Sequence, residues 1–107
     1  MTQLASALFK RWAHSREEDT KDMTVFRPSS FAFPPSRGRE GIEFRENGEF
    51  IHYLIGATDR SDAVVGRWRV ERDNIIEVDF PTARVSPYRL VLISVDDDVL
   101  KVRREAR

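Results

Sequence analysis

The two histidines are the first side chains to consider for chemistry, because histidine titrates close to neutral pH. His52 follows Asn47-Gly48, and Asn-Gly is the strongest short signal for a two-residue hairpin loop. Such a loop would place His52 opposite Glu43. A histidine–carboxylate pair can perform general acid–base chemistry, but no nucleophile accompanies it, so a surface ion pair is the favoured interpretation. We assign no catalytic residue, and an enzyme that uses His52 with Glu43 stays an alternative.

Candidate metal ligands are sparse. His14 stands near Glu17 and Glu18, but two histidines without motif spacing do not make a metal site. The run Asp96-Asp97-Asp98 lacks the alternating oxygens, glycine and terminal glutamate of a calcium loop, so it predicts a solvated turn. The chain has no cysteine, which excludes disulfides, thiolate metal sites and a cysteine nucleophile. We therefore expect no metal and no cofactor.

A long loop predicted over residues 27–40 is the strongest candidate for a binding site. Its prolines, serines and glycine break regular structure, and loops of this length in compact domains are often functional. Its arginines could converge on an anion, and its phenylalanines could wall an apolar pocket. In the alternative interpretation the loop crosses the barrel, its aromatic rings plug the interior, and its arginines pair with the acidic run Glu17-Glu18-Asp19. The candidate ligand-binding residues, two of them from the predicted strands, are Phe31, Phe33, Arg37, Arg39, Tyr53 and Trp68.

Hydrophobic periodicity predicts which elements position these residues. Leu4, Leu8 and Trp12 recur every four residues, which predicts an N-terminal helix over residues 2–13. A short strand is expected at 23–26. Three hairpins follow the loop, over 41–57, 64–80 and 88–104, and the first strand of the third is apolar on both faces from Leu90 to Ile93. The predicted fold is mainly β: an antiparallel meander of six to seven strands that forms a small barrel or half-barrel, with one N-terminal helix.

The loop lengths predict the register of the first two hairpins. A two-residue loop at Asn47-Gly48 places Phe44 opposite Ile51, so the core face of the first hairpin is Ile42, Phe44, Ile51, Tyr53 and Ile55. Its other face then carries Phe50, His52 and Leu54. In the second hairpin a three-residue loop over 72–74, with Asn74 in the left-handed conformation, pairs Trp68 with Val78 and Arg69 with Glu77.

The composition is that of one folded domain spanning residues 1–107. Apolar residues make up 40% and charged residues 34% of the 107 residues, and aromatic and β-branched residues are plentiful. Lysine plus arginine equals aspartate plus glutamate, 18 of each, which argues against a dedicated nucleic-acid binder. No segment approaches the ~20 apolar residues of a membrane span, and the N-terminus lacks the features of a secretory signal. We expect a cytoplasmic protein with no nucleic-acid or membrane partner.

The segment Val65-Gly66-Arg67-Trp68, a Gly-x-Trp at the start of a strand, together with the meander that follows it, resembles a reduced calycin, the superfamily of lipocalins and fatty-acid-binding proteins. Leu8 to Trp12 is a weaker echo of the same pattern. The resemblance implies a β-barrel that holds a ligand at its open end. The acidic run at 17–19 and the loop segment Arg37-Gly38-Arg39 are also similar to small uncharacterised bacterial proteins, a resemblance that implies no function.

Two functions from different classes follow. The first is a non-enzymatic binding module for a small apolar or anionic ligand at the open end of a small barrel. The second is a protein-interaction or homodimerisation domain, motivated by the apolar surface that Phe50 and Leu54 would leave beside His52. The aromatic residues that could bind a ligand have a simpler explanation: they form the hydrophobic core that a chain of this length needs.

Overall fold

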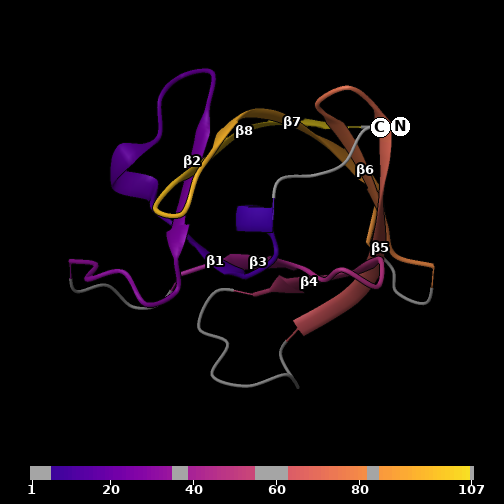
Figure 1. Ribbon diagram of the computed structural model, residues 1–107, viewed down its shortest axis with the longest axis horizontal. Helices are drawn as coiled ribbons and strands as arrows, with labels where there is room; N and C mark the ends of the chain where they lie inside the picture. The colour runs from indigo at the N-terminus through magenta and orange to yellow at the C-terminus, as the bar shows by residue number, and fades with distance from the viewer. Residues whose placement is uncertain (1–5, 35–38, 55–62, 82–84, 107) are drawn as a thin grey trace.

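The strands close into an antiparallel β-barrel, as the computed structural model shows for the residues it describes, 6–34, 39–54, 63–81 and 85–106. Within these ranges eight strands follow one another around the barrel in the order β1-β2-β8-β7-β6-β5-β4-β3 (Figure 1). The prediction of a mainly β antiparallel barrel is confirmed, with eight strands in place of six or seven. The strands are β1 Arg11–His14, β2 Thr24–Pro28, β3 Gly41–Phe44, β4 Glu49–Tyr53, β5 Ala63–Arg72, β6 Ile75–Asp79, β7 Tyr88–Val95 and β8 Leu100–Ala106.

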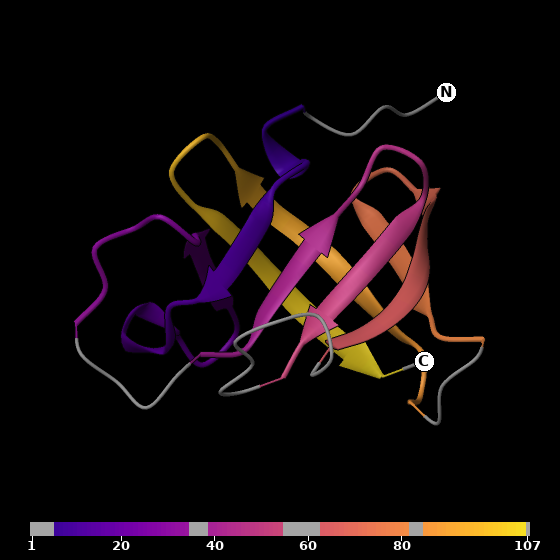
Figure 2. The same cartoon turned by 90° about the horizontal axis from the view of Figure 1, so that it is seen from below.

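Strands β3 to β8 follow one another as a meander. The β1–β2 hairpin closes the barrel with β1 beside β3 and β2 beside β8, which is the reverse of the order in a simple meander. β1 pairs with both β2 and β3, and β2 pairs with β8, so β1 lies between two strands that run in the same direction. Figure 2 shows β1 beside β3 and β4 along one wall of the barrel. The connection between Pro28 and Gly41 therefore joins two strands that run in the same direction. Of the predicted loop over 27–40, residues 29–34 and 39–40 lie outside any strand, Arg27 and Pro28 belong to β2, and residues 35–38 lie outside the described residues.

The predicted N-terminal helix over residues 2–13 is wrong in the part that the structure describes. Residues 6–8 form one turn of 3-10 helix, η1 (Ser6–Leu8), and Trp12 belongs to β1. The spacing of four that suggested a helix has another cause: the chain turns between Leu8 and Trp12, and both side chains enter the barrel, fully buried. The indole Nε1 of Trp12 donates to the carbonyl of Leu8 at 3.0 Å. Tertiary packing thus overrides the helical periodicity of a short segment.

The predicted register of the first hairpin is wrong by one residue. Phe44 lies opposite Phe50, and His52 lies opposite Ile42, not Glu43. The loop has three residues, because the amide of Gly48 donates to the carbonyl of Arg45 at 3.1 Å and Gly48 alone adopts positive φ, at 92°. A two-residue Asn-Gly loop of type I′ would require positive φ at both residues, whereas a type I turn followed by a left-handed glycine requires it only at the glycine.

One residue of slip exchanges the two faces of β4. Phe50 and His52 point into the barrel, and Ile51 and Tyr53, expected in the core, lie on the outer face, although both are buried there. Ile42 and Phe44 on β3 were also predicted for the core face of this hairpin, and they do point inward. Ile55 lies outside the described residues.

The second hairpin has the predicted register but a different turn. Trp68 pairs with Val78 and Arg69 with Glu77, as expected. The left-handed residue is Asp73, at φ 44°, and not Asn74. The pairing shifts between Val70 and Arg72, so the extra residue is taken up by a bulge in β5 and the turn itself is shorter than predicted.

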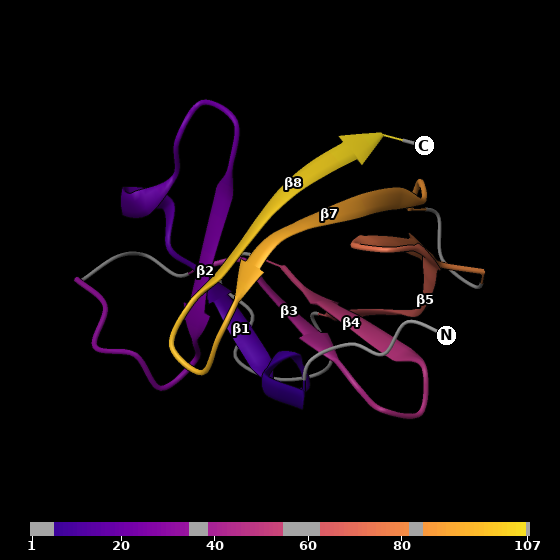
Figure 3. The ribbon, with the colours of Figure 1, turned by 45° about the horizontal axis from the view of Figure 1, so that its top comes forward.

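The third hairpin turns at Asp96–Asp98 as predicted, where the carboxylate of Asp96 accepts from the amides of Asp98 and Val99 at 2.8 and 3.0 Å. Its strands β7 and β8 arch over the side of the barrel opposite β3 and β4 (Figure 3). The expectation that β7 is covered on both faces holds for Leu90 and Val91, whereas Ile93 is 45% exposed. No helix among the described residues is long and apolar enough to cross a membrane.

Candidate functional site

The end of the barrel that carries the β3–β4, β5–β6 and β7–β8 turns is closed by side chains. η1 lies across it, and in Figure 1 this short helix is seen inside the ring of strands. Phe9 contacts Trp68, with ring centroids 5.8 Å apart, and Trp68 in turn packs edge-on against Phe44 at 6.2 Å. The Nε1 of Trp68 donates to the carbonyl of Arg45 at 2.8 Å, which satisfies its only polar atom.

A cavity of about 120 Å³ lies inside the barrel toward the other end. Its lining comes from alternate, inward-facing residues of β1, β2, β3, β4, β7 and β8, with Glu40 from the segment just before β3. Apolar side chains form its inner part and polar side chains surround them, which is the composition typical of a small-molecule site. The apolar lining residues are Phe26, Ile42, Leu90 and Val102; the polar ones are His14, Thr24, Glu40, His52, Tyr88 and Arg104.

His52 is the centre of a hydrogen-bonded chain in this cavity. Its Nε2 lies 2.8 Å from Oε2 of Glu40, and its Nδ1 lies 3.3 Å from the hydroxyl of Tyr88. His52 is 7% exposed, so the surface ion pair expected for it with Glu43 is wrong in both partner and place. Glu43 instead accepts from the hydroxyl of Tyr53 at 2.6 Å and from Arg45 at 2.9 Å on the outside of the barrel.

The surroundings fix the protonation of the two ends of this chain. The hydrogen bond from His52 lowers the pKa of Glu40, so Glu40 is a carboxylate at neutral pH and can only accept. The Nε2 of His52 must therefore carry the proton in that hydrogen bond. Burial raises the pKa of Tyr88 well above its ordinary value, so its hydroxyl stays protonated.

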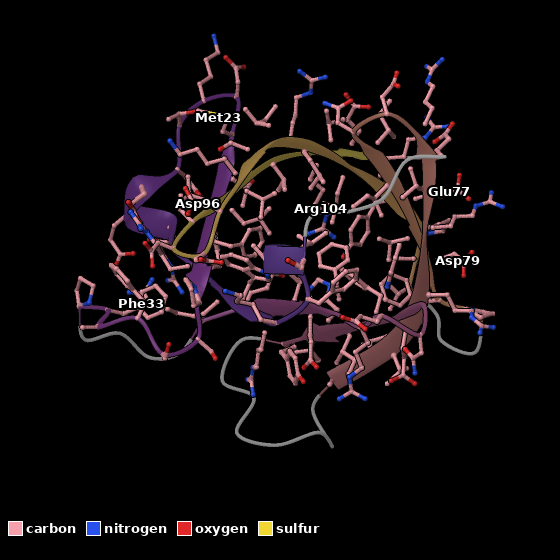
Figure 4. The ribbon with its side chains drawn as sticks, viewed as in Figure 1. Met23, Phe33, Glu77, Asp79, Asp96 and Arg104 are labelled. Carbon is pink, nitrogen blue, oxygen red and sulfur yellow. The ribbon has the colours of Figure 1, made fainter. Side chains whose placement is uncertain are left out.

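Arg104 places a cation over the cavity. Residues 100, 102 and 104 of β8 face inward, whereas Arg103 faces out and pairs with Glu105 at 3.1 Å. The guanidinium of Arg104 stacks on the ring of Tyr88, 4.1 Å from its centroid, and Figure 4 shows this side chain within the ring of strands. Among the described residues no carboxylate forms an ion pair with Arg104, so its donors are available to a ligand.

The second histidine lies at the rim and is already engaged. His14 on β1 forms a 2.8 Å contact through Nε2 with Oδ2 of Asp19, and the other carboxylate oxygen of Asp19 accepts from the amide of Val25 at 2.8 Å. Within the described ranges no three histidine, aspartate or glutamate side chains come together as metal ligands. His14 contacts Asp19, not Glu17 or Glu18, which were considered as its metal-binding companions.

The structure brings together only part of the binding set predicted from the sequence. Phe31 and Phe33 contact each other at 5.0 Å, and Arg39 stacks over Phe33 at 4.3 Å. These residues lie on the outside of the barrel, where Figure 4 labels Phe33, and Phe31 is 41% exposed. Tyr53 lies on the outer face of β4 beneath the guanidinium of Arg11, and Trp68 lies at the closed end. Arg37 lies outside the described residues.

Arg27 and Arg39, two of the arginines in the predicted loop, have the acidic partners that the alternative interpretation gave them. Arg39 forms a two-pronged pair with Glu17 at 2.6 and 2.7 Å, and Arg27 forms one with Glu18 at 2.7 and 2.8 Å. The aromatic residues of the loop do not plug the barrel, however, because the interior is filled from the strands and by Leu8. These contacts fasten the loop to η2 (Arg16–Glu18).

Sequence reasoning missed Glu40 and Tyr88 as hydrogen-bond partners of His52, and it missed Arg104 as part of the cavity lining. A signal for Arg104 was present, because Leu100, Val102 and Arg104 alternate on one face of a predicted strand, and a charge on an apolar face is unusual. No comparable signal existed for Glu40, whose position depends on the register of the first hairpin.

The apolar surface that motivated an interaction domain is not on the outside of the barrel. Phe50 is fully buried in the interior and His52 lines the cavity. Only Leu54, at 48% exposed, remains of that set.

The fold and the cavity define a small closed antiparallel barrel with one end closed by side chains and a polar-rimmed cavity toward the other. No protein-family model matches the chain, and no curated protein and no solved structure is significantly similar to it.

Proposed function

We propose that this protein is a binding module that holds one small, partly apolar molecule in the cavity of its barrel. The observation that supports it is the cavity itself, in which an apolar inner part is surrounded by polar groups from several strands. The arrangement of one closed and one open end is consistent with the calycin-like barrel that the Gly66-Arg67-Trp68 segment resembles. The lining, however, is His52, Tyr88 and their neighbours and not the loop aromatics.

The volume restricts the ligand to a small size. Sites for drug-sized molecules measure roughly 300–1,000 Å³, whereas an engineered cavity of about 150 Å³ accepts benzene. The cavity of about 120 Å³ therefore fits a molecule near the size of a benzene ring or a short alkyl chain with one polar group. A long fatty acid, as the lipocalin resemblance would allow, does not fit it.

The β1–β2 hairpin supplies part of the cavity lining. His14 on β1 and Phe26 on β2 lie opposite each other and face the cavity, with ring centroids 5.6 Å apart. A general acid–base role for His52 has less support, because the hydroxyl bonded to its Nδ1 belongs to Tyr88, whose pKa is raised by burial, so this hydroxyl is a poor nucleophile.

The test is a ligand titration followed by amide NMR. The panel contains short-chain and benzene-ring compounds that bear a carboxylate, an amide, an alcohol or an amine. Saturable shifts should concentrate on the lining residues, and Thr24→Phe, which fills the cavity, should abolish them. Val65→Phe is the matched control, because Val65 lies on the outer face of β5 and is 49% exposed. Binding that survives Thr24→Phe, or no saturable binding by any compound, would refute the proposal.

A further inference from the structure

The hydrogen bonds of His52 leave the cavity short of a donor when this imidazole is neutral. The Nε2–H donates to the carboxylate of Glu40, so the unprotonated Nδ1 must accept, and its partner is the hydroxyl of Tyr88. The only proton on that hydroxyl is thereby turned toward His52 and away from the cavity. A ligand oxygen then meets Tyr88 as an acceptor, not as a donor.

One proton on Nδ1 reverses this arrangement. The imidazolium donates from both nitrogens, so the Tyr88 oxygen accepts from Nδ1 and its O–H becomes free to donate into the cavity. Arg104 stacks on the same tyrosine ring, which brings its N–H donors, not paired with any carboxylate in the described part of the chain, to the same side of the site. Two donors, the Tyr88 hydroxyl and the Arg104 guanidinium, then lie on the same side of the cavity, where each can donate to one oxygen of a carboxylate.

The charges around His52 favour the same change. The groups that face it are Glu40 from the segment before β3, Tyr88 from β7 and Arg104 from β8, while His14 on β1 is held by Asp19. Glu40 and Arg104 carry opposite charges, so a bound carboxylate adds one further negative charge beside His52. A proton on His52 restores neutrality.

We propose that the ligand of this cavity is a small carboxylic acid bound as its anion, and that its binding is coupled to the uptake of one proton by His52. The carboxylate accepts from Tyr88 and Arg104, and its carbon skeleton contacts Phe26, Ile42, Leu90 and Val102. This inference rests on the proposed function, because it names the ligand class and the proton linkage of the same site.

Isothermal titration calorimetry with benzoate and with benzamide tests both parts. At about pH 8 benzoate binding should take up close to one proton. This uptake is measured as a dependence of the binding enthalpy on the ionisation enthalpy of the buffer. The affinity for benzoate should fall about tenfold per pH unit around that pH, whereas benzamide binding should be independent of pH.

Four variants localise the effect. His52→Gln should abolish the proton uptake, and His14→Gln should keep it even where it changes the affinity, because His14 is engaged by Asp19 at the rim. Arg104→Gln should lower the affinity for benzoate roughly tenfold to hundredfold. Arg103→Gln is its control: Arg103 is adjacent but faces outward, so this change should leave the affinity for benzoate nearly unchanged.

The outcomes separate the two proposals. Benzoate binding without proton uptake, or uptake that persists in His52→Gln, would overturn the inference. Binding of benzamide but not benzoate would overturn it and leave the proposed function standing. If neither compound nor any other of the panel binds at the cavity, both proposals fail.

Discussion

Gly66 is the residue at which a single methyl group should cost most. A Cβ added to it would lie 2.2 Å from the carbonyl oxygen of Asp79 and 2.6 Å from the ring of Phe80, where contacts under 3.0 Å essentially never occur. The nearest obstacle is backbone of the paired strand β6, so no side-chain rotation relieves it. We expect Gly66→Ala to destabilise the protein by about 3 kcal/mol, the upper end of the usual range for overpacking.

The expected loss is large enough to measure by two independent methods. For a chain of this length it corresponds to a fall in Tm of about 13 °C by calorimetry, and it should appear as a lower urea midpoint at unchanged m-value. Gly48→Ala is the comparison: no atom lies within 4 Å of its added Cβ, but its φ of 92° disfavours alanine by about 1–2 kcal/mol. If Gly66→Ala unfolds within 0.5 kcal/mol of the wild type, the steric reasoning is refuted.

Three further predictions concern the elements around the site. Hydrogen bonds from their arginine partners lower the pKa of Glu17 and of Glu18 to about 2, so the stability these pairs contribute is complete above pH 4.5 and is lost as the pH falls toward 2; urea midpoints across this range check it. Trp12→Phe removes the indole bond to the buried Leu8 carbonyl and should cost about 1–3 kcal/mol in urea unfolding. Asp96→Ala removes two hydrogen bonds to backbone amides of the β7–β8 turn and should cost about 1 kcal/mol, with faster amide exchange confined to that turn.

Local signals were sufficient where they agreed with long-range packing. The second hairpin shows this: pairing Trp68 with Val78 on one face and Arg69 with Glu77 on the other left only one acceptable register, and the structure has it although the turn differs. A hairpin whose two faces differ clearly in polarity specifies its register by that difference, and the turn then adapts with a bulge.

The first hairpin offered no such contrast. Ile51 and Tyr53 on one face and Phe50 with Leu54 on the other are similarly apolar, so the choice rested on the turn alone. The same limit applies to the N-terminal segment, where a spacing of four fits a helix as well as a turn into a strand. The N-terminal segment forms a strand because β1 fills the position between β2 and β3 and so closes the barrel. That position is a property of the whole barrel and not of the local sequence.

The candidate site therefore depends on which residues form the loop of the first hairpin. Because Glu46, Asn47 and Gly48 form a three-residue loop, Arg45 lies opposite Glu49 and His52 points inward. Deletion of Glu46 would leave Asn47-Gly48 as a two-residue type I′ loop between the same two flanking residues, so every later pair of the hairpin is kept.

We expect this deletion to preserve the barrel, with stability within about 1 kcal/mol of the wild type, and to leave His52 inside it. Acylation by diethyl pyrocarbonate, followed by mass spectrometry, measures the accessibility of His52, with His14 at the rim as the internal reference. His52 should stay protected relative to His14 in both proteins. Protection lost in the deletion variant alone would show that the strands had slipped, and the argument that the loop length sets the register, and through it the site, would be wrong.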